Sequence, residues 1–249
     1  MKKILLLLTT PYLLLAGYTA HISPITSSVK KRMINGGSWR RGCPVPLSDL
    51  RYLTMTYRGF DNRDHRGEMI VHRSVAKEVT DIFGKLYKRG YPIRKMKLVS
   101  DYHASDFQSI EADNTSAFNC RPVTGGKKWS NHSYGKAIDI NPIENPYISR
   151  SGRIAHKASR KYRKRVRSGH SAGQEVMMLP SDTIVKLFKQ RGWRWGGDWK
   201  SIKDYQHFDK PVKGRGTATS KHNKRSGTTK KRPQNAKALF ETLNKSGGI

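Results

Sequence analysis

Two stretches of the chain place apolar residues at helical spacing. Between residues 70 and 87 the apolar positions recur every three or four residues, and Gly90 with a nearby proline ends the run. This pattern predicts an amphipathic helix that covers a sheet. A second helix is predicted from residue 181 or 182 to residue 190, with Ser181 able to cap it and Gly192 just beyond its end.

Two shorter segments have the character of strands. Lys95–Tyr102 alternates apolar and polar residues, and Ala137–Ile140 is a short apolar run interrupted by Asp139. Both are strand candidates. Because side chains alternate along a strand, Ile138 and Ile140 are expected to face the core while Asp139 faces a cleft.

The first twenty residues place an apolar run after two lysines and end in small residues. This layout is typical of a secretory signal peptide, and we expect cleavage near residues 16–20. A membrane anchor is the alternative, but Thr9, Thr10 and Pro11 interrupt the run, which is shorter than the roughly 20 apolar residues that a span needs. The sequence therefore predicts an exported protein of the periplasm or cell envelope.

Composition divides the rest of the chain. Residues 21–42 form a polar leader that we expect to be mobile, and one domain is expected over residues 43–210. Inside it, residues 149–173 include a long basic run without an acid, which predicts a solvated loop or flexible flap. Residues 211–249 are basic and rich in Gly, Ser and Thr, so we expect a largely disordered tail.

The charge is strongly positive. The formal net charge is +31, from 49 Lys and Arg against 18 Asp and Glu. An exported chain of this kind is expected to meet anionic wall polymers or lipid headgroups, although a basic surface that only confers solubility is an alternative. A nucleic-acid-binding protein would also explain the charge, but no such motif is recognisable. We expect a monomer without a specific nucleic-acid partner.

The chain has two cysteines, Cys43 and Cys120. An even count in an exported protein is compatible with a single disulfide, and two buried free thiols are the alternative. Neither cysteine has a metal-ligand spacing.

Two short segments carry the candidate chemistry. SNHSYGKAIDIN contains His132 and Asp139, and DYQHF contains Asp204 and His207. Zinc catalysis uses three protein ligands, a fourth position open to water and a nearby base that does not bind the metal. His132, Asp139 and His207 can be the ligands, and Asp204 is near enough to reach a water. The other histidines lack such surroundings and are interpreted as structural: His21, His65, His72, His103, His156, His170 and His222.

The pattern SxHxxGxAxD, followed later by a carboxylate, two residues and a His, resembles the signature of the VanY-type D-alanyl-D-alanine carboxypeptidases and L-alanyl-D-glutamate peptidases. Three further segments share the resemblance: Asn114–Arg121, Asn141–Tyr147 and Gly192–Trp199. The resemblance therefore extends over about residues 43–209.

The resemblance implies that His132, Asp139 and His207 bind zinc, that Asp204 is the catalytic base and that Arg121 contacts the substrate. Many relatives have Glu at the base position. A structural ion pair is the alternative for Arg121. Three tryptophans can either shape the cleft or pack in the core, and the core is expected for at least two: Trp193, Trp195 and Trp199.

The same resemblance implies an α+β fold similar to the LAS enzymes and hedgehog domains. We expect a small, mostly antiparallel sheet with helices packed on one side and zinc at the sheet edge. The implied function is a zinc peptidase that hydrolyses D-Ala-D-Ala or L-Ala-D-Glu bonds in peptidoglycan stem peptides. A non-catalytic wall-binding protein that retains the peptidase fold is the alternative.

Overall fold

The structure of the protein is a computed structural model, and it describes residues 17–124, 126–169 and 172–212. Most of the predicted signal peptide and nearly all of the predicted tail lie outside these residues. The α-helices are α1 (Ser27–Asn35), α2 (Ala76–Lys88), α3 (Asp106–Glu111), α4 (Ala172–Glu175) and α5 (Thr183–Lys189). The strands are β1 (Ala20–Pro24), β2 (Leu50–Arg58), β3 (Asp64–His72), β4 (Lys95–Met96), β5 (Asn114–Thr115), β6 (Ala137–Asp139), β7 (Tyr147–Ile148), β8 (Arg194–Trp195), β9 (Lys203–Asp204) and β10 (His207–Asp209).

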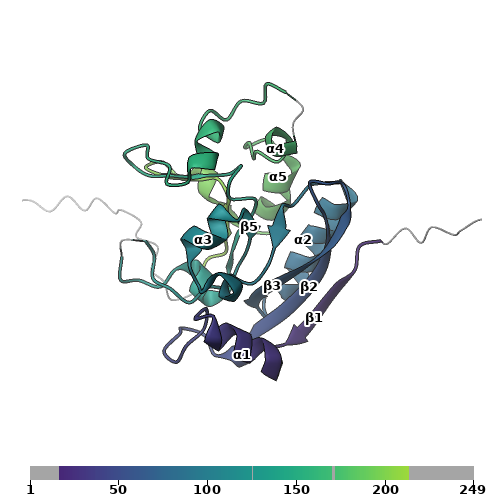
Figure 1. Cartoon of the computed structure of the whole chain (residues 1–249), viewed down its shortest axis with the longest axis vertical. Helices are drawn as coiled ribbons and strands as arrows, with labels where there is room; N and C mark the ends of the chain where they lie inside the picture. Colours follow the sequence, from purple (N-terminus) through teal and green to yellow (C-terminus); the bar gives the residue numbers. More distant parts are fainter. Residues whose placement is uncertain (1–16, 125, 170–171, 213–249) are drawn as a thin grey trace, which may run out of the picture. The chain divides into compact units, whose positions relative to one another are not determined.

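The longest strands form an antiparallel sheet in the order β1-β2-β3 (Figure 1). β2 buries every second side chain from Leu53 to Tyr57, as strand geometry requires. Helix α2 lies along this sheet (Figure 1) and completes the main core with its apolar face. The residues of that face are Val79, Ile82, Phe83 and Leu86.

The helix predicted over residues 70–87 begins later than expected. Ile70 and Val71 belong to β3, where Tyr52 of β2 pairs with Ile70, and α2 starts only at Ala76. The β2–β3 hairpin did not appear among the predicted elements. Ile70 and Val71 fit both the end of a strand and the first turn of a helix, so the local spacing of apolar residues cannot separate the end of β3 from the start of α2.

The segment over residues 21–42, predicted to be mobile, is instead ordered. β1 pairs with β2, and α1 begins after Thr26, whose side chain accepts a hydrogen bond from the Val29 N–H. Val29 and Met33 lie four residues apart on the buried face of α1. Arg32 donates to Glu68 of β3 at 2.5 Å.

A second antiparallel sheet has the order β6-β10-β8 and carries the candidate site. Phe208 in β10 pairs with Ile138 of β6 on one side and with Trp195 of β8 on the other. Helix α5 packs on this sheet, where Phe188 stacks on Phe208 with ring centroids 4.1 Å apart. The predicted second helix is thus confirmed, although Asp182 and not Ser181 is its N-cap residue.

Two short pairs complete the described sheets: β4 pairs with β5 in parallel and β7 pairs with β9 antiparallel. Only Lys95–Met96 of the segment predicted as a strand over residues 95–102 forms a strand, because a 3-10 helix follows at Val99–Tyr102. The mixed fold with small antiparallel sheets agrees with the α+β class. The single sheet that we expected is divided into four among the described residues.

The flap predicted over residues 149–173 is folded in its described part. Ile154 and Tyr162 are buried. The guanidinium of Arg165 turns inward and donates to the backbone oxygens of Glu144 at 2.6 Å and Met178 at 3.0 Å. The prediction of a wholly solvated loop is therefore wrong, because a guanidinium can be buried when carbonyl oxygens accept its protons.

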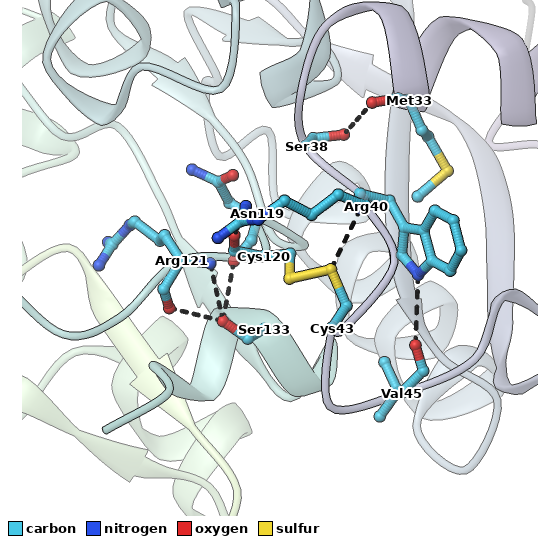
Figure 2. Close-up of a disulfide and its surroundings, with 10 residues drawn as sticks. Met33, Ser38, Arg40, Cys43, Val45, Asn119, Cys120, Arg121 and Ser133 are labelled. Atoms are coloured by element: carbon cyan, nitrogen blue, oxygen red, sulfur yellow. Dashed lines mark hydrogen bonds between the residues drawn. A yellow bond between two sulfur atoms is a disulfide. The ribbon is translucent and has the colours of Figure 1, made fainter. Parts of the chain in front are cut away.

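The predicted disulfide between Cys43 and Cys120 is present (Figure 2). The Arg40 side chain adds a hydrogen bond to the Cys120 carbonyl oxygen at 2.7 Å. The next residue, Arg121, donates its N–H to the Ser133 hydroxyl at 2.9 Å. The disulfide thus ties the N-terminal part of the domain to the 3-10 helix η3 (Asn131–Tyr134), which contains His132. Within the described residues, no helix has the length and apolarity needed to cross a membrane.

Candidate metal centre and active site

Three predicted ligands come together in space. The Nε2 atom of His132 lies 3.2 Å from His207 Nδ1 and 3.2 Å from Asp139 Oδ2. His207 Nδ1 lies 2.9 Å from Asp139 Oδ1. Candidate ligand atoms of the three side chains all lie within 4.8 Å of one another.

The second sheet and the turn before it create this arrangement. Asp139 of β6 and His207 of β10 are direct partners in the antiparallel register, so their side chains are neighbours. Gly135 ends η3 with a φ of 62°, and a Cβ there would lie 2.5 Å from the backbone nitrogen of His72. Glycine therefore allows the chain to leave η3 against β3 and enter β6, which brings His132 beside Asp139.

A hydrogen bond orients the imidazole of His132, and a carboxylate faces the outer nitrogen of His207. The Nδ1–H of His132 donates to the Ala117 carbonyl oxygen at 2.6 Å, which leaves the Nε2 lone pair directed at the cluster. The outer nitrogen of His207 lies 3.9 Å from the Asp209 carboxylate. Asp209 is itself held by Arg194 at 2.6 Å and by Asn131. The sequence analysis did not assign this orienting role to Asp209, although its position two residues after His207 on one strand was a signal.

The cluster favours a bound positive charge. Burial alone would lower the pKa of His207, but the carboxylates of Asp139 and Asp209 outweigh it and raise that pKa to about 10. Burial likewise opposes ionisation of Asp139, yet the imidazoles of His132 and His207 hold its pKa well below the ordinary value. A cation shared by these side chains is therefore stabilised.

The donor set fits a zinc ion. Two imidazole nitrogens and one carboxylate oxygen are common zinc ligands, and bonds of roughly 2.0 to 2.1 Å in a tetrahedron place ligand atoms about 3.3 Å apart. The separations of 2.9 and 3.2 Å between the donor atoms are close to that value. Three protein ligands leave one position of the tetrahedron open.

Asp204 lies in the same cleft as this cluster. It belongs to β9, where it pairs with Tyr147 of β7. Its Oδ1 atom is enclosed and accepts no hydrogen bond from the described residues. Burial raises the pKa of Asp204 to about 6; His207 opposes this shift and Asp139 adds to it. A carboxylate that has one oxygen atom without a hydrogen bond and a pKa near neutral is suited to accept and return a proton.

The cleft has a volume of about 570 Å³ and is lined by the cluster, Asp204 and Arg121. Aromatic side chains from distant segments form other parts of its wall: Phe107, Tyr147, His156 and Trp199. The Trp199 ring lies beside His207, with centroids 5.4 Å apart. Trp193 and Trp195 are buried in the core, as expected for at least two of the three tryptophans.

Arg121 lines the cleft and is ion-paired at the same time. Its guanidinium contacts Asp106 at the start of α3 and donates to the Pro122 carbonyl oxygen at 3.1 Å. Asp106 also accepts a hydrogen bond of 2.8 Å from Asn119. The ion pair considered in the sequence analysis is therefore present, and it holds the side chain at the cleft, whereas substrate contact by Arg121 stays a prediction.

Sequence reasoning missed His156. Its Nδ1 lies 2.5 Å from Glu111 Oε2 at the end of α3, its ring stacks on Phe107 with centroids 4.5 Å apart, and it lines the cleft. The sequence contains no signal for this, because His156 lies in the basic segment and Glu111 is 45 residues away. Among the remaining histidines, the described ones do not line the cleft, and His170 and His222 lie outside the described residues.

One family model matches the chain. Residues 124–210 match the model described as D-alanyl-D-alanine carboxypeptidase. The matched segment contains His132, Asp139, Asp204 and His207, whereas Arg121 and the first sheet precede it. No solved structure matches the chain significantly. At the level of family, the match supports a peptidase related to the D-alanyl-D-alanine carboxypeptidases.

Proposed function

We propose that this protein is a zinc-dependent peptidase that hydrolyses peptide bonds in the stem peptides of peptidoglycan. The observation that carries the proposal is the convergence of His132, Asp139 and His207 in one cleft with Asp204, whose Oδ1 atom accepts no hydrogen bond from the described residues. The family match supports a peptidase and peptidoglycan-type substrates. The two nitrogens and one oxygen that the cluster offers support zinc as the metal.

His132, Asp139 and His207 would hold the metal. When bound, zinc supplies a Lewis acid that polarises a carbonyl group and lowers the pKa of water towards about 7. Asp204 accepts the proton of the attacking water and returns it to the departing amine. Its raised pKa of about 6 suits both transfers near neutral pH.

Arg121 binds the substrate in this proposal. Its guanidinium stays charged and offers several N–H donors to a substrate carboxylate or to the charge that develops on the scissile carbonyl. The ion pair with Asp106 keeps the side chain at the wall of the cleft.

Muropeptide digestion tests the proposal. The zinc-loaded protein is incubated with purified muropeptides, and mass spectrometry identifies the products. Loss of one alanine indicates cleavage of D-Ala-D-Ala, whereas release of the stem beyond its first alanine indicates cleavage of L-Ala-D-Glu. Asp204→Asn at equal zinc content is the control. A zinc-loaded protein that binds muropeptides without cleaving them would establish the wall-binding alternative instead.

We also propose export, with cleavage of the signal peptide before Tyr18. The Tyr18 hydroxyl donates to the Thr80 carbonyl oxygen of α2 at 2.5 Å, and the hydroxyls of Thr19 and Thr56 are 2.8 Å apart. Cleavage after Ala20 would remove both contacts. N-terminal sequencing of the secreted protein decides the site, and a mature chain that begins at residue 21 would contradict this assignment.

A further inference from the structure

The described part of the basic segment, residues 149–169, has an inner and an outer face. Ile154, Ser159 and Tyr162 are buried, and Arg165 is held by backbone oxygens. These anchors give the segment a defined conformation. The exposed side carries seven cationic residues, which we name the basic face: Arg150, Arg153, Lys157, Arg160, Lys161, Arg163 and Lys164.

The cations of the basic face have no carboxylate partner among the described residues. The segment contains no Asp or Glu, and none of the seven residues takes part in a described ion pair. Elsewhere on the domain some cations do: Arg32 pairs with Glu68, Arg194 with Asp209 and Lys210 with Glu78. The basic face is thus an uncompensated positive surface on a folded support.

The basic face adjoins the cleft. Four residues of the same segment line it: Ile154, Ala155, His156 and Ser159. Lys157 and Arg160 directly follow two of these residues and point outward, as their exposure indicates. A ligand bound on the basic face therefore lies beside the opening in which the proposed chemistry takes place.

We propose that the basic face binds a linear polymer of phosphodiesters and so holds the enzyme against the cell wall. Four of its seven cations are arginines, whose guanidinium groups bind phosphate through two parallel hydrogen bonds. Successive cations along one segment match a chain that carries a charge in every repeat. The proposal rests on the proposed function for its cellular context, and on the surface itself for the chemistry of its ligand.

Two other polyanions fit the surface less well. Among residues 149–169 of the described chain, Val166 is the only exposed large apolar side chain, which is little apolar area for insertion into a membrane. The two residues of this segment with aromatic rings, His156 and Tyr162, are both buried, so the segment offers no exposed ring on which nucleic-acid bases could stack. A polymer of phosphates without bases matches the surface better.

The test compares two full-length variants that lose equal charge. The loop variant carries Arg153→Gln, Lys157→Gln, Arg160→Gln and Lys164→Gln. The control variant carries Lys31→Gln, Arg41→Gln, Lys85→Gln and Arg89→Gln, which are exposed residues of other segments. Each variant replaces two lysines and two arginines, and none of the eight side chains makes a described hydrogen bond or ion pair. Thermal unfolding of both is measured first and should be close to that of the wild type.

Binding to soluble poly(glycerol phosphate) is then measured over a range of salt concentrations. We expect the loop variant to bind about tenfold more weakly at low salt. The slope of the logarithm of the binding constant against the logarithm of the salt concentration should become less steep by about 3. Each lost phosphate contact on a single strand removes roughly 0.7 from this slope. The control variant should stay within about twofold of the wild type. Equal weakening in both variants would show that net charge and not the basic face binds the polymer, which overturns the proposal.

Further arms identify the ligand class and keep the two proposals separate. Tighter binding of a single-stranded oligonucleotide or of phosphatidylglycerol vesicles, at matched phosphate content, would overturn the assignment to a wall polymer. Cleavage of small soluble muropeptides should be unchanged in the loop variant. If the protein binds the polymer through the basic face but has no peptidase activity, the proposed function is refuted and the proposal for the basic face stands. If the protein has peptidase activity but does not bind the polymer through the basic face, the proposal for the basic face is refuted and the proposed function stands.

Discussion

The Nδ1 atom of His132 lies 2.6 Å from the carbonyl oxygen of Ala117. A carbonyl oxygen only accepts hydrogen bonds, so Nδ1 must carry a proton, and Nε2, which faces Asp139 and His207, is the nitrogen left to bind a metal. The backbone that follows β5 thus fixes the tautomer that a metal requires. This relationship makes the cluster ready to bind a cation before any metal arrives.

Removing any one of the three cluster residues should abolish metal binding. We expect His132→Ala, Asp139→Ala and His207→Ala each to lose the zinc, because two protein ligands form an inadequate site. Metal analysis of the purified variants measures this. His72→Ala is the matched control, since His72 is bonded to Ser74 away from the cleft. Full zinc occupancy in the three cluster variants would refute the ligand assignment.

Replacing Asp204 should separate catalysis from metal binding. Asp204→Asn should retain zinc, while turnover of muropeptides falls by roughly 10²–10⁴-fold because the proton acceptor is lost. Asp204→Glu should recover part of the rate. Near wild-type turnover in Asp204→Asn would exclude it as the base, and loss of zinc would make it a ligand.

The pKa of Asp204 predicts where activity falls on the acidic side of the pH profile. Burial raises the pKa of Asp204 to about 6, so the carboxylate that accepts a proton is lost as the pH falls through that value. A bound metal cation stabilises the carboxylate, which places the limb of kcat/KM at or below pH 6. The residual activity of Asp204→Asn should lack this acidic limb. An unchanged limb in this variant would show that another group titrates there.

Two arginines of the basic segment should differ in their effect on stability. Arg165 donates hydrogen bonds to Asn145 Oδ1 at 2.7 Å and to backbone oxygens, and burial lowers its pKa to about 10. Arg165→Met leaves these acceptors unsatisfied and should lower the free energy of unfolding by about 3 kcal/mol. Arg160→Met, on the exposed side, should change it by less than about 0.5 kcal/mol. Urea denaturation compares them, and equal losses would contradict the inward role of Arg165.

Removing the disulfide should destabilise the domain. Cys43 and Cys120 are 77 residues apart, and a cross-link of that span restricts the unfolded chain by roughly 4 kcal/mol. The double variant Cys43→Ser, Cys120→Ser should lose a comparable free energy of unfolding in urea. Peptide mapping without reductant provides the direct control. Two free thiols in protein from an oxidising compartment would disprove the pairing in solution.

His156 should contribute to substrate binding. Its Nδ1 is held by Glu111, so the ring presents its other edge to the cleft. His156→Ala should raise KM for muropeptides about three- to tenfold, the effect of losing one hydrogen bond, and leave kcat and zinc content unchanged. Glu111→Gln should have a smaller effect of the same kind. An unchanged KM in His156→Ala would limit this histidine to a structural role.

The sequence by itself determined the parts that depend on short-range spacing. The turn at Gly135 and the alternation around Asp139 predict how one ligand pair is presented, and α5 follows from apolar residues three and four positions apart. The disulfide could be predicted for a simpler reason, since Cys43 and Cys120 are the only cysteines of the chain. These features require no knowledge of distant contacts.

Only the tertiary structure decided the rest. The carbonyl partner of His132 and the pairing of Glu111 with His156 join segments whose proximity no local pattern encodes. The basic segment is the clearest case. Lys and Arg alone predict solvation, but the backbone oxygens of Glu144 and Met178 bury Arg165, while Arg160 stays exposed. The free energy of burying a charge depends on the acceptors around it, and the fold alone supplies them.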